Sequence, residues 1–100
     1  MGHHVSPQAE ADLDDIWFYV AKESGSIELA TKMVDSFSDQ FLLLGRYPHL
    51  GRPRDDDFGP GSRSIVVSEY VVVYCVEQNG DVLILRVVHG RRDLESLFGE

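Results

Sequence analysis

Apolar residues recur every three to four positions through the first half of the chain, which is the spacing of amphipathic helices. One apolar stripe spans residues 13–20 and a second spans residues 27–44. Ser6-Pro7 precedes the first stripe and Ser26 precedes the second, and both are residue types that favour helix starts. Tyr47-Pro48 follows the second stripe and disfavours further helix. Because the connection between the stripes is short, the pattern predicts two nearly antiparallel helices.

The apolar period shortens to two residues in the second half, which is typical of strands. We predict strands over residues 63–67, 70–77 and 82–88, the middle one dense in valine and tyrosine. Asn79-Gly80 separates the last two and is a strong hairpin signal. Residues 49–61 are rich in Gly, Pro, Arg and Asp, and we expect a polar connection there.

The order of these elements indicates an α+β fold, in which the N-terminal helical hairpin packs on one face of a small antiparallel β-sheet. With 100 residues and no linker, the chain is expected to be a single domain over residues 1–100. Gly2-His3-His4 could be a remnant of cloning, and residues 3–5 could equally form a short edge strand. Residues 93–98 are expected to form one or two helical turns.

Both faces of the predicted sheet are apolar. Strict alternation places Val72 and Tyr74 on one face of the middle strand and Val71 and Val73 on the other. One helical hairpin covers one face, and an uncovered apolar face usually marks a binding surface. The sequence leaves two alternatives open. Either a protein partner covers the second face, or residues 49–61 and the C-terminal tail fold over it.

Charge is unevenly distributed along the chain. The net charge is −8, and a field of that sign does not attract nucleic acid over distance. Residues 1–45 hold eight acidic residues and two lysines, whereas all seven arginines lie from Arg46 onward. The net charge therefore argues against strong nucleic-acid binding, but it leaves room for a local basic surface in the second half.

Several kinds of site and location are excluded by composition. No apolar run approaches the roughly 20 residues that span a bilayer, and no signal peptide is visible. Cys75 is the single cysteine, which excludes an internal disulfide and a Cys-cluster metal site. We expect a cytoplasmic protein that contacts no membrane and needs no metal or cofactor.

Six short segments occur in an order that is specific as a set: residues 6–9, 14–17, 48–54, 59–64, 70–74 and 84–93. Together they cover nearly the whole chain. They resemble the RelE/ParE superfamily of bacterial type II toxin–antitoxin systems, and the ParE branch in particular. The resemblance implies two N-terminal helices packed on a small antiparallel sheet, which is the fold predicted above.

The resemblance also implies a function and partners. A ParE-like toxin is expected to inhibit DNA gyrase by binding, and to be neutralised by a ParD-like antitoxin whose C-terminal segment wraps around it. We expect the antitoxin to contact residues on the strands: Arg63, Ile65, Tyr70, Val72, Tyr74, Ile84, Arg86 and Val88. We expect the target to contact the C-terminal segment: Arg91, Arg92, Leu94, Leu97 and Phe98. Arg86 lies among apolar residues, so it should also have a carboxylate or carbonyl partner.

Two alternatives to this function remain. The RelE branch cuts mRNA on the ribosome, which requires an acid, a base and cations around the phosphate. Arg63, His89 and Arg92 are the candidate catalytic residues for that reaction, although His89 also fits a structural role. The acidic run Asp55–Asp57 stands where that branch has basic residues, which disfavours RNA cleavage. The other alternative is a non-toxic module that only binds an antitoxin.

Overall fold

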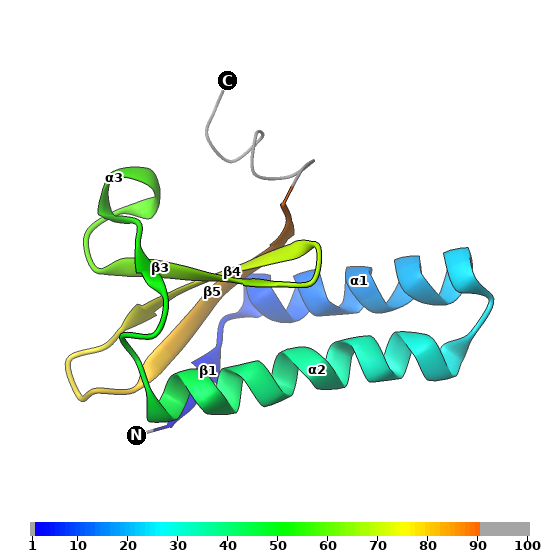
Figure 1. Cartoon of the computed structure of the whole chain (residues 1–100), viewed down its shortest axis with the longest axis horizontal. Coiled ribbons are helices and arrows are strands. Elements are labelled where there is room, and N and C mark those ends of the chain that lie inside the picture. Colours follow the sequence, from blue (N-terminus) through cyan, green and yellow to red (C-terminus); the bar gives the residue numbers. More distant parts are fainter. Residues whose placement is uncertain (1, 91–100) are drawn as a thin grey trace.

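The two predicted helices form the expected hairpin in the computed structural model, which describes residues 2–90 (Figure 1). Helix α1 (Pro7–Ser24) is capped by Ser6, whose hydroxyl accepts a hydrogen bond from a first-turn amide. It ends at Gly25, which has the left-handed φ of 70° that glycine readily adopts. Helix α2 (Ile27–Arg46) begins in the same way, after a serine cap. The prediction of an antiparallel hairpin is confirmed.

The strands form one five-stranded sheet in the order β1-β5-β4-β3-β2. The strands are β1 (His3–Val5), β2 (Arg52–Pro53), β3 (Ser62–Val67), β4 (Tyr70–Val76) and β5 (Val82–His89). The last three form the predicted antiparallel meander. Strand β1 pairs in parallel with β5, so the sheet is mixed rather than purely antiparallel. The prediction of an edge strand over residues 3–5 is confirmed.

The segment predicted as a polar connection contains β2 and the single-turn helix α3 (Asp55–Phe58). Side-chain bonds to the backbone shape it. The Ser62 hydroxyl donates to the Arg54 carbonyl at 2.7 Å, and Arg54 Nε donates to the Ser64 hydroxyl at 2.9 Å. Hydrogen bonds of this kind do not change the spacing of apolar residues along the chain. The spacing therefore could not predict these two short elements.

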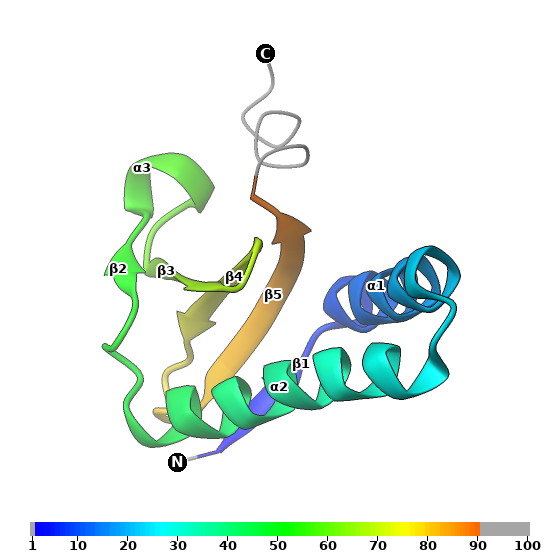
Figure 2. The same cartoon turned by 45° about the vertical axis from the view of Figure 1, so that its right-hand side comes forward.

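The main core lies between the helical hairpin and one face of the sheet, which we call the helix face (Figures 1 and 2). Phenylalanine and leucine side chains of α2 meet aromatic and branched side chains of β4 and β5. The buried members of this core are Ala9, Ile16, Phe37, Phe41, Leu44, Tyr70, Val72, Tyr74, Val82, Ile84 and Val87.

This core corrects one expectation about the sheet. The structure places four residues predicted to bind the antitoxin, each at most 7% exposed, under the helices: Tyr70, Val72, Tyr74 and Ile84. The face that carries these four residues is therefore the one that the hairpin covers. Periodicity showed that both faces are apolar but could not show which one the hairpin covers.

A β-bulge in β5 corrects a second expectation. Val73 pairs with Arg86 but the next residue, Tyr74, pairs with Ile84, so one residue of β5 is extra. An extra residue moves every later side chain to the opposite face. Val87 therefore belongs to the core on the helix face, whereas Val88 does not. Strict alternation along residues 82–88 would place Val88 on the same face as Ile84.

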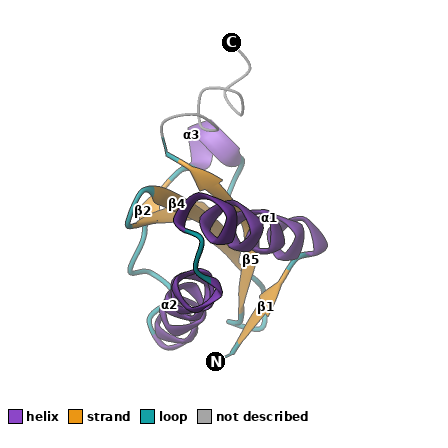
Figure 3. Ribbon diagram, turned by 90° about the vertical axis from the view of Figure 1, so that its right-hand side faces the viewer, coloured by secondary structure: helices purple, strands orange, loops and turns teal. Residues whose placement is uncertain are grey.

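The opposite face of the sheet, which we call the second face, carries a smaller apolar cluster. Val71, Val73 and Val88 are buried there, and Leu85 packs against them. Phe58 of α3 also packs against this cluster, and α3 lies on the far side of the sheet from α1 (Figures 2 and 3). Residues 49–61 thus supply part of the cover for the second face.

Candidate functional site

Tyr74 and Arg63 fix the loop between α2 and β2. The Tyr74 hydroxyl donates to the Pro48 carbonyl and accepts from the Gly51 amide, each at 2.8 Å. Arg63 Nη1 donates to the Gly51 carbonyl at 2.6 Å. Both polar groups of the Gly51 backbone are therefore satisfied by side chains. Arg63, a predicted antitoxin contact and candidate catalytic residue, is engaged in holding this loop.

Burial raises the pKa of the Tyr74 phenol, and the Gly51 amide and the Arg63 charge oppose the shift only in part. The unfolded chain therefore ionises this phenol at lower pH than the folded chain does. As pH rises above the ordinary tyrosine pKa of about 10, the free energy of unfolding should fall.

We expect the Tyr74→Phe variant to lose less stability at alkaline pH than the wild-type protein does. At neutral pH the variant should be less stable by about 1–2 kcal/mol, because the Gly51 amide loses its buried acceptor. Between about pH 9 and pH 11 its stability should fall less than that of the wild type. Urea unfolding at a series of pH values measures both effects. If the two proteins lost the same amount of stability as the pH rises, the Tyr74 phenol would not be the group that causes the loss.

A bidentate ion pair ties α1 to β5 beside the bulge. Arg86 Nε donates to Asp12 Oδ2 at 2.8 Å, and Arg86 Nη2 donates to Asp12 Oδ1 at 3.1 Å. The Val87 amide donates to the same carboxylate at 2.9 Å. The sequence expectation that Arg86 has a carboxylate partner is confirmed. The Arg86 side chain is 39% exposed, so it also remains accessible to a partner protein.

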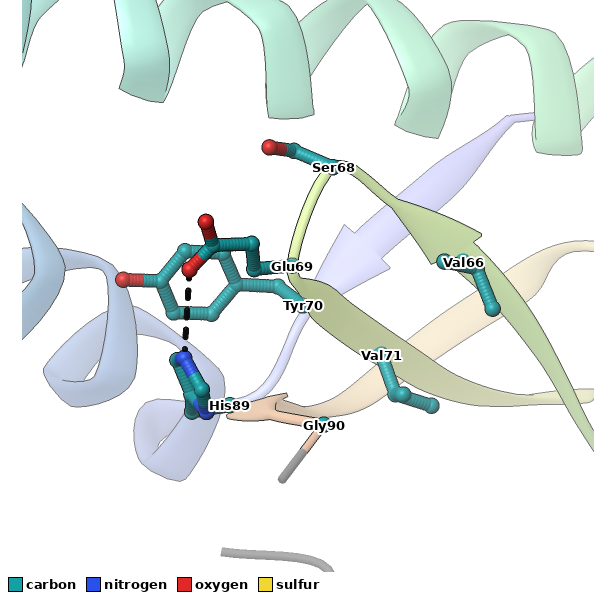
Figure 4. Close-up of a pocket in the computed structure, with 7 residues that line it drawn as sticks. All are labelled: Val66, Ser68, Glu69, Tyr70, Val71, His89 and Gly90. Atoms are coloured by element: carbon teal, nitrogen blue, oxygen red, sulfur yellow. Dashed lines mark hydrogen bonds and ion pairs between the residues drawn. The ribbon is translucent and has the colours of Figure 1, made fainter. Parts of the chain in front are cut away.

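Tyr70, His89 and Glu69 lie together at the turn between β3 and β4 (Figure 4). His89 Nε2 is 3.3 Å from Glu69 Oε1, and the His89 ring meets the Tyr70 ring nearly edge-on, with centroids 5.4 Å apart. A hollow of about 710 Å³ is lined by these residues and by Val66 and Val71. It is the larger of two hollows that share Tyr70 and His89.

The candidate catalytic residues do not converge within the described part of the chain. Arg63 pairs with Tyr74 and His89 pairs with Tyr70, so the two backbones lie four residues apart along β4. That separation is about 13 Å at the usual rise of a strand. The third candidate, Arg92, lies outside the described residues. The five predicted target contacts, Arg91, Arg92, Leu94, Leu97 and Phe98, also lie outside them.

Exposed apolar side chains were largely missed by the sequence reasoning. Val66 is 73% exposed, whereas its neighbour Ile65, a predicted antitoxin contact, is half-buried on the helix face. Alternation along β3 does place the two on opposite faces, and this signal could have identified Val66. A second group of exposed apolar residues lies where α2 runs into the loop after it: Leu42, Leu43, Tyr47 and Leu50.

The described residues contain no cluster of three or more side chains suited to hold a metal ion. None of the described helices is long and apolar enough to cross a membrane. The residues Asp55–Asp57 of α3 are exposed, and Asp57 pairs with Arg54 at 3.1 Å.

Comparison of the sequence with known proteins gives consistent matches. A family model described as "ParE toxin of type II toxin-antitoxin system, parDE" matches residues 4–94. Toxin ParE3 of Caulobacter vibrioides is 34% identical over 90 residues, which cover 89% of this chain and 86% of that protein. Toxin ParE1 of the same organism is 32% identical over 97 residues, covering 97% of both chains.

Solved structures match the fold. A chain of the chromosomal ParDE TA system from P. aeruginosa superposes with a TM-score of 0.75 at 25% identity, covering 89% of this chain and 95% of that one. The toxin–antitoxin complex RelBE2 from Mycobacterium tuberculosis matches with a TM-score of 0.58 at 22% identity, covering 88% and 95%. The second match supports the fold alone.

Proposed function

Because the chain belongs to the ParE toxin family of type II toxin–antitoxin systems, we propose that it inhibits DNA gyrase by binding and is neutralised by a ParD-like antitoxin. Its place of action is the cytoplasm, where gyrase acts on DNA. The family membership supports the toxin role. The P. aeruginosa relative, which belongs to a ParDE system, supports a paired antitoxin.

The separation of Arg63 from His89 favours binding over RNA cleavage. Cleavage through a 2′-hydroxyl needs an acid, a base and cations around one phosphate. Arg63 is held by backbone carbonyls of the loop before β2, and His89 pairs with Glu69 at the other end of β4. The exposed carboxylates of Asp55–Asp57 would repel a phosphate chain.

The antitoxin surface that we propose differs from the one expected from the sequence. Residues in the core on the helix face are inaccessible unless the fold opens. Leu43 lies on the last turn of α2, and Tyr47 directly follows the helix and donates its amide to the Leu43 carbonyl. Leu50 comes next in the adjoining turn, where its amide donates to the Tyr47 carbonyl, and all three side chains are exposed. We add these three to Ile65 and Arg86, which were expected from the sequence, as the proposed antitoxin contacts.

Two assays test this function, one with DNA gyrase and one with programmed ribosomes. Purified toxin should inhibit supercoiling by gyrase, and the antitoxin encoded beside it should reverse the inhibition. On programmed ribosomes it should produce no codon-dependent mRNA cleavage. Cleavage that disappears in Arg63→Ala would contradict the proposal in favour of the RelE-like alternative. Unimpaired growth of cells that express the toxin alone would favour a non-toxic antitoxin-binding module.

A further inference from the structure

Positive charge and exposed apolar side chains occur together at the C-terminal end of α2 and in the loop that follows. Residues 40–54 contain three arginines and no acidic residue, in a chain whose net charge is −8. Leu43, Tyr47 and Leu50 lie in this segment and are 37%, 58% and 54% exposed. Together with Arg46 and Arg52 they make up what we call the basic loop surface. We propose, on the basis of the function proposed above, that this surface binds an antitoxin segment that is both apolar and acidic.

The arginines of this surface carry charges that no acid neutralises. Arg46 and Arg52 are exposed, and neither has an ion-pair partner among the residues that the structure describes. Arg63 adds a third positive charge at the base of the loop, where its guanidinium donates to the backbone carbonyls of His49 and Gly51. Guanidinium groups bind carboxylates through paired, charge-assisted hydrogen bonds. A carboxylate of a partner can therefore bind here without displacing an acid of the toxin itself.

The backbone keeps the members of the basic loop surface close together. The Tyr47 amide donates to the Leu43 carbonyl at 2.9 Å, and the Leu50 amide donates to the Tyr47 carbonyl at 3.0 Å. Arg52 follows at the start of β2, which pairs with β3. Apolar and charged residues thus alternate along one turn, and a single short segment of a partner can contact both kinds.

The acidic residues of α3 do not cancel this positive charge. Figures 1 and 2 show α3 and the C-terminal end of α2 on opposite sides of strand β3. Asp57 pairs with Arg54 at 3.1 Å, and the Asp55 carboxylate accepts a hydrogen bond from the Gly61 amide at 3.0 Å. Two of the three acids of α3 are therefore engaged within their own segment.

The apolar members of the surface favour a protein segment over nucleic acid. Leu43 and Leu50 gain about 25 cal/mol per Å² when another apolar group removes them from water, and a sugar–phosphate backbone offers no such group. The net charge of −8 also repels a long polyanion over distance, whereas a short acidic segment carries only a few charges. The relative from P. aeruginosa belongs to a ParDE system, which makes the antitoxin the protein partner of choice.

The two kinds of contact should affect antitoxin binding in different ways. Charges at the edge of an interface mainly raise the association rate and make it depend on salt, whereas well-packed apolar contacts mainly slow dissociation. We therefore expect Arg46 and Arg52 to control how fast the antitoxin binds. Leu43, Tyr47 and Leu50 should control how long it stays bound.

Binding kinetics of the full-length toxin with the purified antitoxin encoded beside it test this assignment. In the double variant Arg46→Glu/Arg52→Glu the association rate should fall about tenfold or more at low ionic strength. In about 1 M salt, where the Debye length is about 3 Å, the rate should approach that of the wild type. Leu50→Ser should instead raise the dissociation rate about tenfold and leave the salt dependence unchanged.

Lys22→Glu/Lys32→Glu is the matched control. Both lysines are exposed, Lys22 in the last turn of α1 and Lys32 in the first half of α2. Each glutamate double variant changes the net charge from −8 to −12, since each reversal contributes −2. The control should bind the antitoxin within about twofold of the wild-type rate, because the changed charges lie away from the contact.

Circular dichroism confirms that each variant is folded before its binding is measured. Arg46→Gln/Arg52→Gln removes the two charges without reversing them, and it should slow association in the same direction by a smaller factor.

Equal losses in the two glutamate double variants would overturn the assignment, because the net charge rather than the basic loop surface would then govern binding. Binding of all variants at the wild-type rates would also overturn it and would leave the proposed function intact. Failure of the wild-type toxin to bind the antitoxin would contradict the proposed function as well. Weaker binding of Arg46→Glu/Arg52→Glu to a DNA duplex, with antitoxin binding unchanged, would assign the surface to nucleic acid instead.

Discussion

Gly51→Ala should lower the free energy of unfolding by about 3 kcal/mol, a large share of the roughly 5–15 kcal/mol that stabilises a small domain. A Cβ at this position would lie 2.6 Å from the Tyr74 hydroxyl and 2.7 Å from the Ser64 carbonyl. The carbonyl is sheet backbone and cannot move aside. The loop would have to lift, and it would lose the Gly51 bonds to Tyr74 and Arg63.

Urea denaturation followed by circular dichroism measures the loss for Gly51→Ala. Gly2→Ala is the matched control, because a Cβ at Gly2 meets nothing within 4 Å. The control should unfold at the wild-type urea concentration. If Gly51→Ala also unfolded there, the close approach of the loop to Tyr74 would be wrong, and so would the role of Arg63 as its anchor.

Asp12→Ala should cost about 2–3 kcal/mol of stability. The Asp12 carboxylate accepts two bonds from the Arg86 guanidinium and one from the Val87 amide. Its loss leaves a charged group and a backbone amide without their acceptor. The partial exposure of Arg86 keeps the expected cost below that of a fully buried pair.

Two further variants test the Asp12 prediction. One is a control, and the other is expected to have an intermediate stability. Asp14→Ala removes an exposed acid from the same helix and should change stability by less than about 0.5 kcal/mol. Asp12→Asn keeps an acceptor for the Val87 amide and should lie between Asp12→Ala and the wild type. Equal stability of Asp12→Ala and Asp14→Ala, measured by urea unfolding, would show that the pair does not hold α1 to the sheet.

The helices could be predicted because their signals are local. Ser6 and Ser26 cap them, Gly25 ends the first, and the apolar stripes give their period. The antiparallel meander could be predicted for the same reason, since residues of period two flank the turns at 68–69 and 77–81. In each case the residues that decide the structure lie within a few positions of one another.

The errors arose where distant residues decide the structure. The bulge in β5 lies where Ser6 and Asp12, more than seventy positions away, hydrogen bond to Leu85 and Val87. Without the bulge, alternation assigned Val88 to the wrong face. The choice of covered face has the same origin, because it depends on how the helical hairpin packs against the whole sheet.

The sequence allowed the protein family to be predicted, but it did not show which residues form the candidate site. The segments that resemble ParE toxins gave the family, which the comparisons confirm. They did not show that Arg63 holds a loop through the Gly51 carbonyl, or that Val66 rather than Val72 is exposed. Those facts depend on tertiary contacts and side-chain exposure. The target contacts predicted from Arg91 to Phe98 lie outside the described residues and stay a prediction.

A supercoiling assay with purified gyrase and relaxed plasmid tests the central claim most directly. The toxin is titrated against gyrase, with two controls: toxin first mixed with excess antitoxin, and a folded chain ended after Gly90. We predict that the full chain blocks supercoiling and accumulates cleaved DNA near stoichiometric amounts, and that both controls leave supercoiling intact. Full supercoiling at a large molar excess of folded toxin would contradict the account.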